Sequence, residues 1–206
     1  MSKFEIFFNI DIKNFKLNVF IIDTNSEDIL LTKDFKFDKY QYSNFLIIDK
    51  INNILKKLIL EIEKHLDASV SKINLMVEQE NSYNIDLSIK KNFENKIIDK
   101  KNIEYLIQDL RQQLLTNNPD KKFIHILVKK CIIDSDEYNI IPIGNKCKNF
   151  IVDLSFIHIP KKLLNELERL FSEHQMFINK VICTNYAKTL IVTEFDNLSK
   201  AGLNII

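Results

Sequence analysis

The chain has 206 residues, 46% of them apolar and 28% charged, so it is long enough and apolar enough to bury a core. Its formal net charge is +1, with lysines dispersed among acids, which gives no electrostatic reason to expect nucleic acid or an anionic membrane surface as a partner. Its two glycines, Gly144 and Gly202, exclude a glycine-rich phosphate loop, so we do not expect a nucleotide-hydrolysing enzyme.

Two short strands rich in aromatic and β-branched residues are predicted at 4–10 and 15–22, and a third at 28–37. Together they indicate an antiparallel meander. A helix is predicted at about 47–66, because apolar residues recur at helical spacing with lysine and glutamate opposite. A strand at 72–78 follows, and this order is typical of half of an α/β layer.

The middle of the chain repeats the alternation of strand and helix. A strand is predicted at 83–91, and Asp99 is a suitable N-cap for a second amphipathic helix, whose exit Pro119 marks. Three more strands are expected at 122–133, 137–143 and 149–159.

The last part of the chain is predicted to hold a third amphipathic helix after Pro160, then a strand at 176–183. A fourth helix follows and ends at Gly202. The final residues, 203–206, resemble a strand that has just begun. We expect an open apolar edge there, and therefore self-association or a partner.

The spacing of the cysteines and the lengths of the apolar segments indicate where in the cell the protein is located. Cys131, Cys147 and Cys183 lie far apart and form no CxxC or CxxxC pair, so the sequence predicts reduced thiols and no metal site. No stretch approaches the ~20 apolar residues of a membrane span, and the N-terminus has no signal-peptide cleavage region. We expect a cytoplasmic protein without a direct membrane anchor.

Several short motifs, in this order, resemble the N-terminal half of FtsA, the actin-like cell-division protein of bacteria. The strongest match is FIHILVKKCIID followed by IIPIG, in which His125, Asp134, Pro142 and Gly144 stand at the matching places. Further matching positions are Asp11, Ile12, Lys16, Ile98, Asp99, Asn102, Tyr186, Ala187 and Gly202.

The resemblance implies an α/β fold: an actin-like, RNase H-like half-domain with an inserted SHS2-type strand–helix–strand–strand subdomain. Residues 1–81 and 161–206 would form the actin-like subdomain, and residues 82–160 the insert. In the family that insert faces other division proteins and neighbouring FtsA molecules. By the same comparison, the chain ends before the second phosphate motif and the domains that complete the nucleotide cleft.

The first hairpin departs from the family pattern, in which small and hydroxyl residues form a phosphate loop. Lys13, Asn14 and Phe15 occupy those positions here, and Phe15 would crowd the loop. The resemblance leaves Asp11, Asn14 and Lys16 as a vestigial phosphate site. One carboxylate and one lysine cannot hold Mg–ATP tightly, so we expect no cofactor, no metal and no catalytic residue.

The other polar clusters are more typical of turns and core positions than of a metal site or a catalytic site. Asp134, Asp136 and Glu137 are typical of a solvated hairpin turn. His125 and His158 lie in apolar strands and are expected to be half-buried, and Cys131 is expected to be a core thiol.

The sequence therefore favours a non-catalytic division protein that acts through protein contacts. Its partners would be division proteins or a second copy, docked at an exposed edge of the insert's sheet, with the chain held at the inner face of the cell membrane through those partners. Three alternatives stay open: a residual actin-fold ATPase, one half of a split gene, and an actin-like scaffold of the pilus-assembly type.

Overall fold

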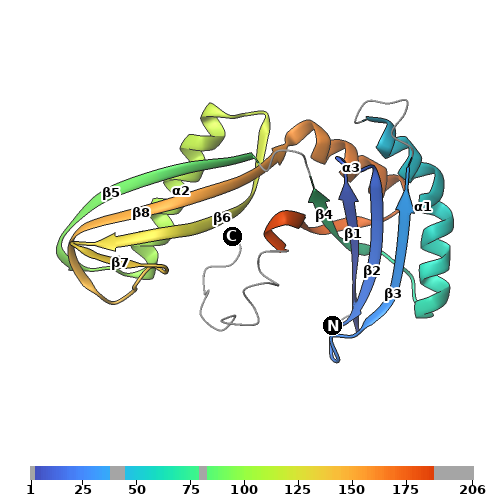
Figure 1. The fold of residues 1–206 in the computed structure, drawn as a ribbon, viewed down its shortest axis with the longest axis horizontal. Helices are drawn as coiled ribbons and strands as arrows, with labels where there is room; N and C mark the ends of the chain where they lie inside the picture. The colour runs from blue at the N-terminus through green and yellow to red at the C-terminus, as the bar shows by residue number, and fades with distance from the viewer. Residues whose placement is uncertain (1–2, 38–44, 79–82, 188–206) are drawn as a thin grey trace. The chain divides into compact units, whose positions relative to one another are not determined.

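A computed structural model describes residues 3–37, 45–78 and 83–187. The described residues fall into two compact units, one made of 3–37, 45–78 and 162–187 and the other of 83–161. Each unit contains one sheet (Figure 1). Among the described residues, no helix has both the length and the apolar character that crossing a bilayer requires.

The sheet of the first unit has five strands in the order β3-β2-β1-β4-β9. The strands are β1 (Phe4–Asp11), β2 (Lys16–Asp23), β3 (Ile29–Lys36), β4 (Lys72–Glu78) and β9 (Phe177–Cys183). The first three form the predicted antiparallel meander. β4 pairs with β1 and β9 pairs with β4, both in parallel.

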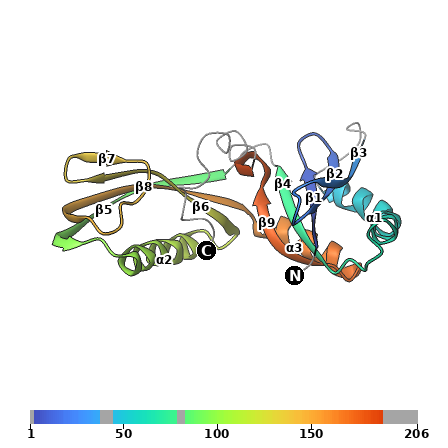
Figure 2. The same ribbon diagram turned by 90° about the horizontal axis from the view of Figure 1, so that it is seen from below.

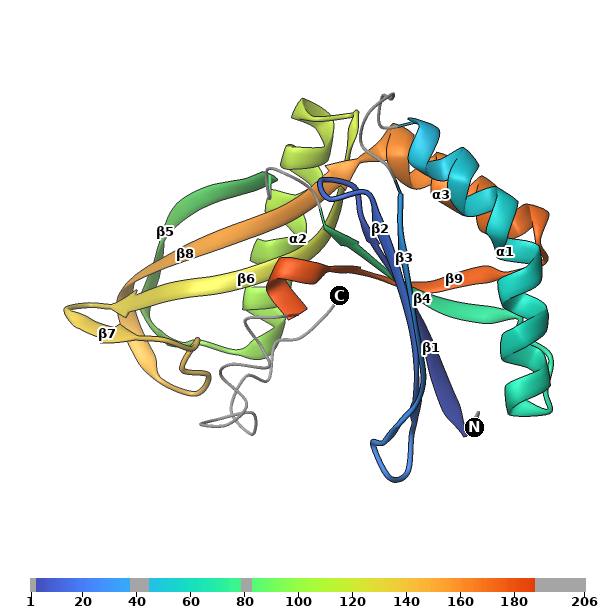
Figure 3. The same cartoon turned by 45° about the vertical axis from the view of Figure 1, so that its right-hand side comes forward.

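Helices α1 (Phe45–Leu66) and α3 (Lys161–Glu173) lie on one face of this sheet (Figure 3). Alternate residues of β1 turn toward them, so Ile6, Phe8 and Ile10 are buried. The ring of Phe8 meets that of Phe171 in α3 edge to face, with centroids 5.2 Å apart. The residues between the buried ones point to the opposite face.

The second unit has a four-stranded sheet in the order β5-β8-β6-β7, with α2 (Lys100–Asn117) along one face (Figure 2). Its strands are β5 (Tyr83–Ile97), β6 (Lys121–Ile133), β7 (Asp136–Tyr138) and β8 (Lys146–Pro160). Asp99 caps α2 as predicted, since its Oδ1 accepts a hydrogen bond from the Asn102 backbone N–H at 2.6 Å. Phe123, Phe150 and Phe156 are among the buried residues between helix and sheet.

The strand expected at 137–143 is wrong beyond Tyr138. Pro142 has no N–H to donate to a ladder, and the Ile143 N–H donates to the Ile141 carbonyl 3.0 Å away in a tight turn. Gly144 follows at φ 95°, a conformation that favours glycine, and its N–H donates to the Ile98 carbonyl at 2.8 Å.

Two other expectations were incomplete. β5 runs to Ile97 instead of ending at residue 91, because a bulge at Glu94 and Asn95, both with positive φ, lets pairing with β8 resume. A helix begins at residue 184 and is described as far as 187. The rest of the predicted fourth helix, Gly202 and the edge at 203–206 lie outside the described residues.

Candidate functional site

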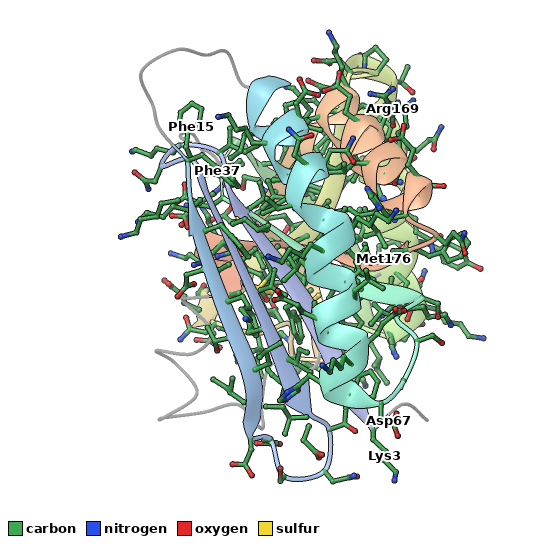
Figure 4. The ribbon with its side chains drawn as sticks, turned by 90° about the vertical axis from the view of Figure 1, so that its right-hand side faces the viewer. Lys3, Phe15, Phe37, Asp67, Arg169 and Met176 are labelled. Carbon is green, nitrogen blue, oxygen red and sulfur yellow. The ribbon has the colours of Figure 1, made fainter. Side chains whose placement is uncertain are left out.

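The turn between β1 and β2 brings the three predicted site residues together. Asp11 ends β1 and Lys16 begins β2, and the two are directly opposite in the antiparallel register. Asn14 lies between them in the turn. Figure 4 shows this end of the sheet, where Phe15 and Phe37 lie close together, far from Lys3 and Asp67.

Asn14 closes the turn on the Asp11 carboxylate. The Asn14 backbone N–H donates to Asp11 Oδ1 at 2.9 Å, and Asn14 Nδ2 donates to Oδ2 at 2.8 Å. Each carboxylate oxygen of Asp11 thus accepts one hydrogen bond from within the turn. Asp11 is also only 7% exposed.

The backbone on both sides of Asn14 is also engaged. The N–H of Ile12, itself buried, donates to the Glu78 carbonyl at 3.0 Å and ties the turn to the end of β4. Phe15 has φ 52°, a left-handed conformation that a bulky residue rarely adopts, and its carbonyl accepts from the Phe37 N–H at 2.8 Å. A phosphate loop needs N–H groups that point toward an anion. Here the N–H groups of Ile12 and Asn14 already donate hydrogen bonds to Glu78 and Asp11 within the fold.

A row of polar side chains, which the sequence gave no reason to group, crosses the sheet face opposite α1 and α3. Thr184 Oγ1 donates to Asn9 Oδ1 at 2.8 Å, and Asn9 Nδ2 donates to Asn18 Oδ1 at 3.4 Å. Asn18 Nδ2 in turn donates to Asp34 Oδ1. The signal that could have revealed the row is an asparagine within the mostly apolar middle of each of these two strands.

A second polar group lies on the same face nearer β9. Asn74, 3% exposed, donates from Nδ2 to Glu5 Oε2 at 3.2 Å and accepts at Oδ1 from Asn179 Nδ2 at 3.1 Å. The rings of Phe7 and Phe20 stack nearby in the register, with centroids 4.9 Å apart. This face combines hydrogen-bonded amide groups, the carboxylates of Glu5 and Asp34, and a stacked aromatic pair.

The acidic cluster of the second unit holds a turn together. Asp134 Oδ1 accepts from the backbone N–H groups of Lys148 and Asn149 at 3.1 and 2.9 Å. Glu137 forms a salt bridge of 2.6 Å with Lys130. Among the described residues, no group of three or more histidine, cysteine or acidic side chains is placed to hold a metal ion.

The two strand histidines are buried more deeply than the expected half-burial, and Cys131 is a core thiol as predicted. His125 and His158 are 9% and 5% exposed, and burial lowers the pKa of His125 to about 4 and lowers the pKa of His158. Burial also raises the pKa of the Cys131 thiol to about 11. These shifts have one main cause, because burial in the apolar sheet favours the uncharged form of each group.

Comparison with solved structures identifies the fold. A structure titled PilM-PilN type IV pilus biogenesis complex matches with a TM-score of 0.54 and 6% sequence identity, over 95% of this chain and 51% of that chain. The chain has an actin-like fold. It spans about half the length of the matched protein, and at this identity the likeness concerns the fold alone.

Two further structures match with lower scores. One is the cytoplasmic domain of EpsL, an inner membrane component of the type II secretion system of Vibrio cholerae, with TM-score 0.42, 8% identity and coverage of 87% and 57% of the two chains. The other is a Bacteroides thetaiotaomicron protein with an actin-like ATPase fold, with TM-score 0.40, 12% identity and coverage of 96% and 58%. No protein-family model and no curated protein matches the chain.

Proposed function

We propose that this chain is a non-catalytic actin-fold protein that works by binding other proteins in a membrane-associated assembly. One observation is central: the Asn14 side chain and backbone occupy both oxygens of Asp11, the one carboxylate that the family resemblance assigns to a nucleotide site. A turn closed in this way favours a structural role over phosphate binding. On this proposal the chain provides binding surfaces for other proteins and catalyses no reaction.

The type of assembly that the fold comparison supports is the type IV pilus apparatus. The matched structure is described as a complex of PilM with PilN, and its PilM-like fold covers 95% of this chain. By analogy, the present chain would bind a partner of the pilus-assembly apparatus and be held near the cytoplasmic membrane by that partner. This assignment rests on fold analogy.

A role in cell division is the second candidate, and one contact favours it. The FtsA-like motif residues come from two separate segments, and the structure joins those segments by hydrogen bonds: the Gly144 N–H donates to the Ile98 carbonyl at 2.8 Å, and the Ile98 N–H to the Asn145 carbonyl at 2.9 Å. The motifs therefore make one local structure. On this candidate, residues 82–160 would be the FtsA-type insert and the remainder the actin-like subdomain.

Nucleotide binding by the full chain tests the non-catalytic part of the proposal. Calorimetric titration with Mg–ATP should show no saturable binding below about 1 mM. Tight, magnesium-dependent binding that Asp11→Asn abolishes would contradict the proposal. Binding that Asp11→Asn leaves unchanged would place the nucleotide outside this turn, and would equally require a new interpretation of the chain as a nucleotide-binding protein.

Affinity capture with the full chain as bait tests the assembly. Enrichment of a pilus-assembly membrane protein supports the first candidate, and enrichment of the tubulin-like division filament supports the second. The bait should be compared with a chain of the same length unfolded by Phe8→Asp, which removes surfaces that need the fold. Partners that bind both baits equally would count against either role.

A further inference from the structure

The outer edge of β5 is a long strand edge at the side of the second unit's sheet. β5 pairs with β8 on one side, and within the described part of the chain no strand pairs with its other side. Its pairing with β8 is regular from Tyr83 to Asn92, before the bulge. An unpaired edge of this length offers backbone donors and acceptors to a further strand.

The side chains of this regular segment alternate between two faces. Ile85, Leu87 and Ile89 are partly buried against the core under α2. Asp86, Ser88 and Lys90 are exposed on the opposite face. Asp86 forms a salt bridge of 2.6 Å with Lys129, whose hydrogen bond and, to a smaller extent, positive charge hold the pKa of that carboxyl below its usual range. Lys90 forms no ion pair with another described residue.

The sequence of this edge is complementary to itself when two copies run antiparallel. A two-fold axis perpendicular to the sheet keeps each face on its own side, so the axis must pass midway between one residue and the same residue of the copy. With the axis midway between the two Ser88 residues, Asp86 lies opposite Lys90 of the copy, and Lys90 opposite Asp86. The reverse face then sets Leu87 opposite Ile89 at its centre, and Ile85 opposite Lys91 toward its ends. Directly opposite pairs bring Cβ atoms within about 5 Å, close enough for both kinds of contact.

We propose that two copies of this chain associate through antiparallel pairing of their β5 edges, centred on Ser88, to join two four-stranded sheets into one. Each Asp86 then lies between Lys129 of its own sheet and Lys90 of the other copy. Ser88 marks the middle of the regular segment, so the overlap extends from Asn84 to Asn92 before the bulge turns the strand away. This proposal does not depend on which assembly the protein serves.

The edge strands of the other sheet do not have this property. In β9, Lys180 stands at the midpoint and would meet its own copy. In β3, centring on Lys33 opposes two lysines, and centring on Thr32 sets no pair of opposite charges across the edge. Like charges directly opposite oppose pairing. In a competing explanation, the lysines of β5 prevent aggregation by opposing edge-to-edge strand pairing. Inverting the charge of Lys90 would then leave the association of two copies unchanged.

Charge inversion in the full-length chain separates these explanations. Lys90→Glu alone places two acidic pairs between the paired β5 edges. Asp86→Lys alone places two lysine pairs between them. Each should weaken the dimer by about tenfold or more in sedimentation equilibrium. An equimolar mixture of the two variants should form a heterodimer of near wild-type affinity, because both cross-strand pairs are then opposite in charge. Restoration by mixing is specific to this register.

Lys101→Glu on α2 and Asp136→Lys on β7 make the same charge changes on exposed residues away from the edge, and should leave the dimer unchanged. As a second measurement, Ser88→Cys should be joined to its own copy by a short thiol cross-linker, and Lys90→Glu in the same chain should suppress that product. The proposal is overturned if the wild-type chain stays monomeric up to about 1 mM. It is equally overturned if both inversions match their controls, or if mixing the variants restores nothing.

Discussion

Asn14 binds Asp11 through two hydrogen bonds, one from its backbone N–H at 2.9 Å and one from its side-chain amide at 2.8 Å. The pair closes the turn between β1 and β2 around a carboxylate that is 7% exposed. A buried carboxylate needs such donors, because leaving it without them costs its full desolvation penalty. The same two hydrogen bonds therefore stabilise the turn and leave the Asn14 N–H groups engaged with Asp11 instead of with a phosphate.

Replacing Asn14 by alanine should lower the free energy of unfolding by about 1–2 kcal/mol, because it removes one of the two donors to a buried charged acceptor. Urea denaturation would measure the change. Lys13→Ala in the same turn is the matched control, since Lys13 is exposed and should alter stability by less than about 0.5 kcal/mol. Equal effects from the two substitutions would contradict the role given to Asn14.

Replacing Asp134 by alanine should lower the free energy of unfolding by about 1–2 kcal/mol, because two backbone N–H groups of β8 lose their carboxylate acceptor. Asp134→Asn should cost less, since it keeps an acceptor and tolerates the φ of 55° at this position. Thermal unfolding with and without divalent cations would check both points. A cation-dependent rise in Tm that Asp134→Ala abolishes would instead indicate a metal site.

Elements whose apolar pattern is strong could be predicted from the sequence. The strand at 72–78 matches β4, and the cap at Asp99 fixes the start of α2, because each depends on local side-chain chemistry. The bulge at Glu94 and Asn95 could not be predicted. The bulge keeps Phe93 buried against Phe150, with the two ring centroids 5.5 Å apart. Phe150 belongs to β8 and lies more than fifty residues away in the sequence, so local patterns do not reveal this contact.

The polar groups of the first unit show a second limit of sequence reasoning. Asn9 and Asn18 are visible as exceptions within apolar strands, but only the register β1–β2 sets them opposite each other. Thr184 joins them from a distant segment, once the parallel pairing of β4 with β9 fixes where β9 ends. The turn was easier to locate, because Asp11 and Asn14 are close in sequence. Its closure by Asn14 does not follow from the resemblance, which assigns Asn14 to a phosphate site.

Burial of His125 should make the protein less stable in mild acid. Its pKa falls from 6.5 to about 4 in the folded state, so the unfolded chain binds a proton that the folded chain does not. Stability is complete above about pH 6.5 and is lost as the pH falls toward about 4. From about pH 7 to about pH 5 the loss should reach about 2 kcal/mol.

Denaturation at a series of pH values would measure this slope, and His125→Gln should reduce it. His158, whose pKa is also lowered by burial, should contribute a remaining slope of the same sign. An unchanged slope in His125→Gln would show that other groups cause the acid sensitivity.

The contact of Phe8 with Phe171 should be a main source of stability in the first unit. Both rings are fully buried and meet at an angle of 74° across the interface of β1 with α3. Phe171→Ala should lower the free energy of unfolding by about 3–5 kcal/mol, since it removes buried apolar area and leaves a cavity. Phe177→Ala makes the same chemical change at a ring that is 64% exposed, and should cost far less.

A double-mutant cycle with Phe8→Leu and Phe171→Leu would isolate the edge-to-face contact, with a coupling of about 0.5–1.5 kcal/mol expected. Leucine keeps most of the buried volume, so the cycle reports the geometry of the rings more than the loss of area. A coupling near zero, together with a large cost for Phe171→Ala, would mean that α3 is held to the sheet by burial alone. A small cost for Phe171→Ala would contradict the placement of α3 on this face, and with it the separation of the apolar face from the polar face that holds Asn9 and Asn74.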